Sequence, residues 1–215
     1  MFTGLVEEIG VIAGIKKQDN GAVIFLNCKK ILDDLKKGDS VAIDGACQSV
    51  SALNSSGFEV EASAETLELT ILNDYKAGQK VNLEKAMAAG GRFGGHLVSG
   101  HVEGMGSFLK KEKQGLAWNF RFAASENIMK YVVYKGSICV NGISLTVAAI
   151  EENSFSVTVI PVTIEETNLR SLSSGDKVNL EPDILAKYVE KFARRYDNVG
   201  RNITENYLQE HGFID

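Results

Sequence analysis

The stretch Gly90-Gly91-Arg92-Phe93-Gly94-Gly95-His96-Leu97-Val98-Ser99-Gly100-His101-Val102-Glu103-Gly104 lies near the middle of the 215-residue chain and holds two of its three histidines. At its end the sequence starts again, because Ser99-Gly100-His101-Val102-Glu103-Gly104 resembles Thr3-Gly4-Leu5-Val6-Glu7-Glu8. The stretch therefore marks the junction between two related halves.

The correspondence continues through both halves at an offset of 96 to 97 residues. Residues 45–50 (GACQSV) match 142–147 (GISLTV), and residues 78–84 (GQKVNLE) match 175–181 (GDKVNLE). Solenoid repeats are about 20 to 50 residues long, so this period is instead that of a small domain. The sequence predicts domains at 1–96 and 97–182, followed by a helix and tail at 183–215.

Composition narrows the class of protein. The net charge of -5 provides no basic surface for nucleic acid, and no run of 18 apolar residues could span a membrane. The N-terminus has no basic start or apolar core of a signal peptide. Cys28, Cys47 and Cys139 are an odd number with no close pair, which favours a reducing cytoplasm over a disulfide framework or a metal site.

Short runs rich in Val, Ile, Thr and Phe lie between frequent glycines. The runs 58–62 and 80–84 alternate apolar and polar residues, which is typical of half-buried strands. Further runs at 22–27, 41–43 and 48–53 complete the pattern in the first half. Many short strands separated by turns predict an all-β barrel or sandwich in each half.

Three stretches predict helices. Residues 29–35 and 126–132 are equivalent in the repeat, and each predicts a short helix at one end of its barrel. Residues 183–196 follow Pro182 and carry apolar side chains at helical spacing. This amphipathic helix packs either on its own barrel or on the same helix of another subunit. The tail predicts a further helical turn at 202–208.

Cys47 and His101 are the first candidates for chemistry. Free cysteines are most often buried apolar residues, but Cys47 corresponds to Ser144, and two small nucleophilic side chains at matched positions favour matched pockets. His101 is a candidate acid or base, with a hydrogen bond within its loop as the alternative. We interpret His96 as structural, in a turn, and His211 as exposed in the tail.

Short polar side chains mark the ends of matched strands. They are Thr66 and Thr163, Ser49 and Thr146, and Ser63 and Glu65. A pocket lined by such groups would bind a polyhydroxylated, mostly uncharged ligand, and ordinary edge-strand polarity is the alternative. Lys135 is a candidate cation. The glycine-rich stretch matches neither a phosphate-binding loop nor a dinucleotide fingerprint.

Several of these segments resemble the riboflavin synthase family, and the resemblance covers essentially the whole chain. They are residues 1–8 (MFTGLVEE), 94–101 (GGHLVSGH), 141–147 (NGISLTV) and 160–163 (IPVT). The resemblance implies two similar six-stranded Greek-key barrels and a C-terminal α-helix that holds a homotrimer. It also implies that two molecules of 6,7-dimethyl-8-ribityllumazine dismutate without cofactor or metal, between the N-terminal barrel of one subunit and the C-terminal barrel of a neighbour. Some relatives assemble with lumazine synthase.

The resemblance also implies the site residues. It assigns Cys47, His101 and Ser144 to catalysis, with Lys135 and Thr146 in the same region. The family's Asn-Gly and Asp-Gly pairs correspond here to Asp44-Gly45 and Asn141-Gly142, in reverse order, so Asp44 and Asn141 are also catalytic candidates. The general base among His101, Cys47 and Asp44 stays open. The implied substrate-binding residues are Phe2, Gly4, Leu5, Val6, Ser40, Cys47, Gln48, Ser49, Glu61, Ala62, Ser63, Ala64, Glu65, Thr66, Gly100, His101, Val102, Lys135, Ser144, Leu145, Thr146, Thr158, Val159, Ile160, Pro161, Val162, Thr163 and Asp183.

Two alternatives share the barrel architecture. Gln48 and Ser49 stand where the family commonly has Leu and Thr, and the Ser49 hydroxyl can replace that of threonine. A lumazine-binding protein without activity would typically have lost the motif in one half, whereas both halves keep it here. A flavin-binding module of a reductase would need a nucleotide domain that this chain lacks. The sequence therefore favours the enzyme.

Overall fold

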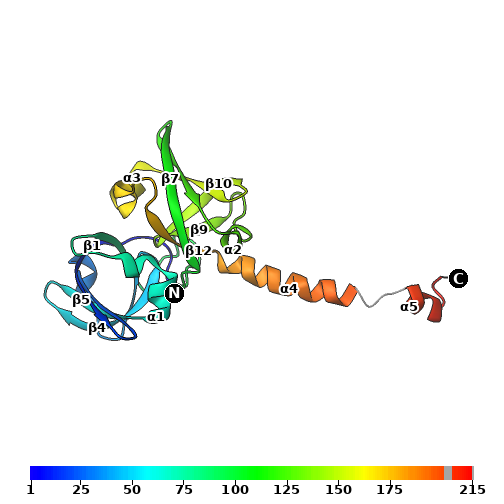
Figure 1. Cartoon of the computed structure of the whole chain (residues 1–215), viewed down its shortest axis with the longest axis horizontal. Coiled ribbons are helices and arrows are strands. Elements are labelled where there is room, and N and C mark those ends of the chain that lie inside the picture. Colours follow the sequence, from blue (N-terminus) through cyan, green and yellow to red (C-terminus); the bar gives the residue numbers. More distant parts are fainter. Residues whose placement is uncertain (201–204, 215) are drawn as a thin grey trace. The chain divides into compact units, whose positions relative to one another are not determined.

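Two closed six-stranded antiparallel barrels account for most of the chain (Figure 1). The computed structural model describes residues 1–200 and 205–214, with side chains described up to residue 194 and from residue 205. It comprises two compact units, Met1–Asp183 with both barrels and Ile184–Asp215 with the C-terminal helices.

Both barrels have the same topology. The first contains β1 (Glu8–Gln18), β2 (Gly21–Asn27), β3 (Ser40–Ile43), β4 (Ala46–Asn54), β5 (Gly57–Ser63) and β6 (Lys80–Lys85), in the order β1-β2-β5-β4-β3-β6. The second contains β7 (Gly104–Gln114), β8 (Ala117–Ala123), β9 (Ser137–Val140), β10 (Ile143–Glu151), β11 (Ser154–Val159) and β12 (Lys177–Pro182), and its closed order β10-β11-β8-β7-β12-β9 is the same cycle. The predicted duplication and all-β class are confirmed.

The irregularities repeat as well as the strands. The register shifts between Ile12 and Gly14 in β1 and at the matched place in β7, and between Val50 and Ala52 in β4 and at the matched place in β10. A bulge bends its strand and increases the local twist, which helps a short sheet to close. Closure leaves neither barrel with an unpaired edge.

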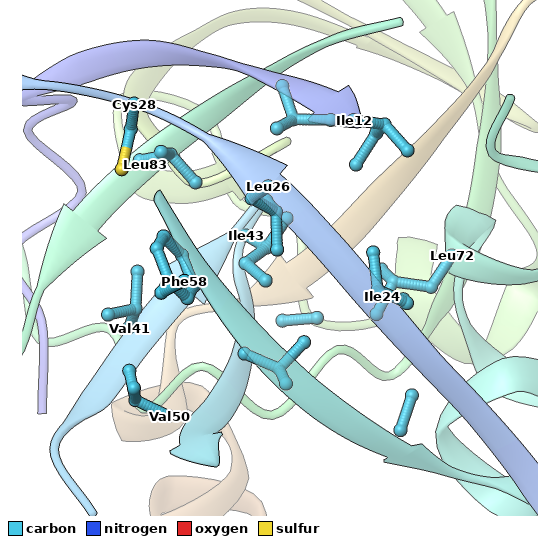
Figure 2. Packing of buried hydrophobic residues seen from close by; sticks show 14 of the residues in the cluster. Ile12, Ile24, Leu26, Cys28, Val41, Ile43, Val50, Phe58, Leu72 and Leu83 are labelled. Carbon is cyan, nitrogen blue, oxygen red and sulfur yellow. The ribbon is translucent and has the colours of Figure 1, made fainter. Parts of the chain in front are cut away.

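Each barrel is filled by its own side chains. In β5, Phe58, Val60 and Ala62 are buried, whereas Glu59 and Glu61 point outward because successive strand residues face opposite sides. Figure 2 shows how side chains from different strands of the first barrel, including Phe58, meet in its interior. The second core instead contains a cluster of phenylalanines: Phe108, Phe120, Phe122 and Phe155.

Short helices lie in the connections between the strands of both barrels. The two predicted at 29–35 and 126–132 are η1 (Lys30–Asp33) and α2 (Glu126–Met129). Matched pairs also follow β5 and β11, namely α1 (Ala64–Leu69) with η2 (Ile71–Asp74) and α3 (Pro161–Glu165) with η3 (Asn168–Ser171).

The implied substrate-binding residues 61–66 and 158–163 therefore lie partly in a strand and partly in the helix that follows it. The strands end at Ser63 and Val159. The Ser63 hydroxyl caps α1 by accepting from Thr66 N, and Pro161 opens α3 with a backbone angle suited to a first helical turn.

The second unit contains α4 (Ile184–Gly200) and α5 (Glu205–Glu210). The helix predicted at 183–196 is confirmed. Of the turn predicted at 202–208, residues 202–204 lie outside the described residues and the rest falls in α5. Among the described residues, no helix combines the length and the apolar character needed to cross a membrane.

Candidate functional site

Two matched carboxylates bind the segments that precede the first strand of each barrel, Thr3-Gly4 and Ser99-Gly100, which we call the entry segments. Glu84 on β6 accepts hydrogen bonds from Thr3 N at 2.7 Å, Thr3 Oγ1 at 2.8 Å and Gly4 N at 3.0 Å. Glu181 on β12 accepts the equivalent bonds from Ser99 and Gly100 at 2.7, 2.6 and 3.0 Å. Burial raises the pKa of both carboxyls, and these hydrogen bonds oppose the rise. Each carboxylate therefore fixes its entry segment by accepting from two backbone N–H groups and one hydroxyl group.

Each entry segment then crosses to the opposite barrel. Gly100 O accepts from Cys47 N of β4 at 2.8 Å, and Gly4 O accepts from Ser144 N of β10 at the same distance. Val102 correspondingly packs on the core of the first barrel. The mouth of each barrel is thus completed by the segment that enters the other barrel, so both halves of the chain contribute to each mouth.

A pocket of about 240 Å³ lies at the mouth of the first barrel. It is lined by Ala46, Cys47, Gln48, Glu65, Thr66, Leu69, Thr70, Gly100, His101 and Val102. Seven of these residues belong to the predicted site, although they come from three separate segments of the sequence. The Cys47 side chain is partly buried and His101 is exposed. A thiol, an imidazole and a hydroxyl therefore share one opening.

The second barrel repeats this arrangement with other side chains. Ser144 and Leu145 follow the first residue of β10 as Cys47 and Gln48 follow the first residue of β4. Thr163 lies on α3 as Thr66 lies on α1. The correspondence extends to a hydrogen bond, because Thr167 Oγ1 donates to Thr163 O at 2.5 Å as Thr70 donates to Thr66 at 2.6 Å. The neighbouring predicted residues Thr158, Val159, Ile160, Pro161 and Val162 form the end of β11 and the start of α3.

Other predicted residues lie outside this pocket. Phe2 is fully buried in a cluster that Cys47 packs against, so it supports the pocket from behind. Ser40 and Leu5 line a separate cavity of about 580 Å³. Ser49 is the Cα partner of Ser40 on the neighbouring strand, and its side chain is exposed.

Lys135 has an unusual backbone. Its φ of 64° lies in the left-handed region, where the matched position of the first half is Gly38 with φ 91°. Only glycine enters this region without steric cost. The second half therefore carries a strained lysine where the first has a glycine, and the Lys135 ammonium lies 5.2 Å from the centre of the Tyr134 ring.

Asp44 and Asn141 lie between the barrels rather than in the pocket with Cys47. Both are essentially fully buried. Asp44 Oδ1 accepts from Asn82 N at 2.7 Å, and Asn141 Oδ1 accepts from Asn179 N at 2.8 Å. The two asparagine side chains then cross over, because Asn179 Nδ2 donates to Asp44 O and Asn82 Nδ2 donates to Asn141 O, both at 2.8 Å. The four residues clamp the barrels together, and the catalytic assignment of Asp44 and Asn141 stays a prediction.

The surroundings of Asp44 contain hydrogen-bond donors that the second half does not repeat. Tyr75 Oη donates to Asp44 Oδ2 at 2.7 Å and Asn168 Nδ2 donates to Oδ1 at 2.8 Å, whereas Leu172 occupies the position matched to Tyr75 in the second half. Burial raises the pKa of Asp44 to about 7, and the hydrogen bonds from Asn82, Tyr75 and Asn168 oppose the rise.

His96 is the residue whose position the sequence did not predict. Its Nδ1 lies 2.7 Å from Ser144 Oγ, and the side chain is only 7% exposed. The interpretation as a turn residue missed this contact, although two adjacent glycines were a signal of close backbone approach. Gln48 stands where the family commonly has leucine, and its buried amide is accommodated because Nε2 donates to the Cys47 carbonyl oxygen.

Comparison with known proteins agrees with the duplicated barrels. The family model "Lumazine binding domain" matches twice, over residues 3–86 and 99–183. The riboflavin synthase of Actinobacillus pleuropneumoniae is 44% identical over 99% of this chain and 100% of its own. That of Bacillus subtilis is 40% identical over the same shares, and that of Schizosaccharomyces pombe is 39% identical over 91% of this chain and 95% of its own.

Solved structures show the same fold at lower identity. LumP complexed with 6,7-dimethyl-8-(1'-D-ribityl) lumazine superposes with a TM-score of 0.77, covering 85% of this chain and 99% of LumP at 21% identity. LumP complexed with riboflavin gives a TM-score of 0.78 over the same shares at 22% identity. The repeated family match and the full-length relatives, together with the two matched barrel mouths, establish that the chain belongs to the riboflavin synthase family.

Proposed function

We propose that this protein is a riboflavin synthase, which dismutates two molecules of 6,7-dimethyl-8-ribityllumazine. One molecule donates a four-carbon unit to the other, giving riboflavin and 5-amino-6-ribitylamino-pyrimidinedione. The observation that supports this best is the pair of matched barrel mouths, one presenting the Cys47 thiol and the other the Ser144 hydroxyl. Two barrel mouths of matched construction suit a reaction between two identical molecules.

The proposed chemistry uses a base and a nucleophile. The methyl group on carbon 7 of the lumazine is acidic because its anion is delocalised over the ring. A general base removes that proton, and a nucleophile adds to carbon 7 of the second molecule. Cys47 and His101 share the pocket of the first barrel and are our candidates for these steps. Holding both molecules in a fixed orientation supplies much of the rate.

We further propose that the subunits form a homotrimer in the cytoplasm. The support is the apolar stripe of Leu185, Tyr188, Val189 and Phe192, all exposed on α4 at helical spacing. The first barrel of one subunit would then face the second barrel of a neighbour, where Asp183 is predicted to contribute. Sedimentation equilibrium of the full chain tests this, since a monomer at micromolar concentration would contradict it. Association with lumazine synthase is a separate prediction, which co-sedimentation of the two proteins would test.

The decisive experiment supplies the purified protein with 6,7-dimethyl-8-ribityllumazine alone. We expect the riboflavin concentration, followed by its absorbance, to rise at half the rate at which the lumazine concentration falls, because two substrate molecules give one riboflavin. Lumazine that stays bound, fluorescent and unconsumed would identify a binding protein instead. Reduction of flavin by a nicotinamide donor would identify a reductase module.

Replacing Cys47 with serine tests the proposed nucleophile. We expect turnover to fall at least about tenfold, since a hydroxyl is a much weaker nucleophile than a thiol, while lumazine binding stays within about twofold. Cys28→Ala is the control, because Cys28 lies in the core and burial raises its pKa to about 12. Equal losses of turnover and binding in Cys47→Ser would contradict the nucleophilic role.

A further inference from the structure

The two matched mouths differ in how their small nucleophilic side chains are held. Ser144 Oγ lies 2.7 Å from Nδ1 of His96, which the proposed reaction does not use. Cys47 has the same backbone setting, but within the described chain no ring nitrogen is hydrogen-bonded to its thiol. The duplication therefore gave two equivalent positions, of which only the second received a buried imidazole partner.

The glycine before His96 makes this contact possible. A Cβ at Gly95 would lie 2.0 Å from Thr3 O and 2.9 Å from Ser144 Cβ, so only glycine fits there. His96 N also donates to Thr3 O at 3.1 Å. The backbone of Gly95 and His96 therefore packs closely against Thr3 and Ser144, and it fixes the position of the imidazole.

The buried environment selects one tautomer of His96. Burial lowers its pKa, against an opposing effect of the Asp183 carboxylate, so the ring is neutral near pH 7 and carries one proton. His96 Nε2 is buried and has no hydrogen-bond partner in the described part of the chain. A proton on Nε2 would leave an orphaned N–H, which is rarer and more costly than an orphaned lone pair. The proton therefore belongs on Nδ1.

We propose that His96 is a positioning residue whose Nδ1–H donates to Ser144 Oγ, which turns the Ser144 hydroxyl proton toward the ligand in the second barrel. Ser144 then acts as a hydrogen-bond donor to a carbonyl oxygen or ring nitrogen of the bound heterocycle. The two mouths would divide the work, with a thiol in the first barrel and a fixed hydroxyl donor in the second. This inference rests on the proposed function for the identity of the ligand.

Two substitutions separate donation from space filling. His96→Asn places an amide N–H where Nδ1–H stands, whereas His96→Phe keeps the ring volume and removes the donor. We expect His96→Phe to lower kcat/KM for the lumazine and the affinity for riboflavin about tenfold, and His96→Asn to lower them less than about threefold. His211→Phe is the control, because His211 is exposed and lies in the turn that follows α5.

The tautomer is measured directly by ¹⁵N NMR of the ¹⁵N-histidine-labelled full chain, with the His96 signals assigned by their loss in His96→Phe. We expect a protonated Nδ1 and a bare Nε2. A protonated Nε2, or a His96→Phe variant that keeps activity better than His96→Asn, would overturn the proposal. If the wild type binds riboflavin but does not consume lumazine, the proposed function fails while the tautomer and the riboflavin affinities still decide the role of His96.

Discussion

Replacing Gly100 with alanine is expected to destabilise the protein by about 3 kcal/mol or more and to remove ligand binding at the first barrel. Gly100 has a φ of 81°, which an L-residue adopts only with strain. A Cβ there would lie 2.6 Å from Cys47 Cβ and 2.8 Å from a ring carbon of Phe2. Relief of that overlap must displace either the thiol or the aromatic ring behind it.

Gly78→Ala separates the two causes. Gly78 has a similar φ of 85°, but its added Cβ would have no atom within 4 Å. It should therefore cost only the backbone strain, about 1 to 2 kcal/mol, and leave ligand binding unchanged. Chemical unfolding followed by circular dichroism and titration with riboflavin measure both effects. Equal unfolding midpoints for the two variants would show that the crossing of Gly100 over Cys47 does not constrain the fold.

Asp44→Asn is expected to change how stability depends on pH. The pKa of Asp44 is about 7 in the folded protein and near its usual value of 3.8 in the unfolded chain. Between these values the folded protein binds a proton that the unfolded chain has lost, so the stability contributed by this group is lost as pH rises toward 7. The wild type should lose up to about 4 kcal/mol relative to Asp44→Asn between pH 4 and pH 8.

The comparison with Asp44→Asn isolates this carboxyl from the others. Glu84 and Glu181 also have raised pKa values, but they titrate in both proteins and cancel in the difference. Asparagine can still accept from Asn82 and Asn168 through its Oδ1, so the clamp is kept. Unfolding free energies at several pH values provide the test. A difference that does not vary with pH would show that Asp44 is ionised throughout.

The double variant Asp44→Asn/Asn141→Asp restores the order of the two residues that the family commonly shows. We expect the double variant to be less stable than the wild type above pH 7, where the new carboxyl is ionised, because Leu172 stands where the second half would need the hydroxyl of Tyr75. The new carboxyl would then lack one of the donors that Asp44 has. If the double variant consumed lumazine faster than the wild type, that result would instead support a catalytic carboxylate in the second barrel.

Much of the fold could be predicted from the sequence because the relevant signals are local or repeated. Alternation in 58–62 places Phe58 and Val60 inside a strand, and helical spacing after Pro182 predicts α4. The offset of 96 to 97 residues turns each local signal into two, which predicts the duplicated barrels with little ambiguity. Candidate pocket residues such as Cys47 and His101 could be named from their types and matched positions.

The tertiary contacts of the polar residues could not be predicted from local or repeated signals. Asp44 and Asn141 sit beside turns in the sequence like ordinary site residues, yet folding brings Asp44 against Asn179, 135 residues away, and buries both between the barrels. His96 looked like a turn residue until the linker was folded against Ser144, 48 residues further on. Periodicity and residue type determine which side of a strand or helix a residue occupies. Only the closure and packing of the two barrels decide which buried polar groups meet, and hence which of them position a ligand and which hold the barrels together.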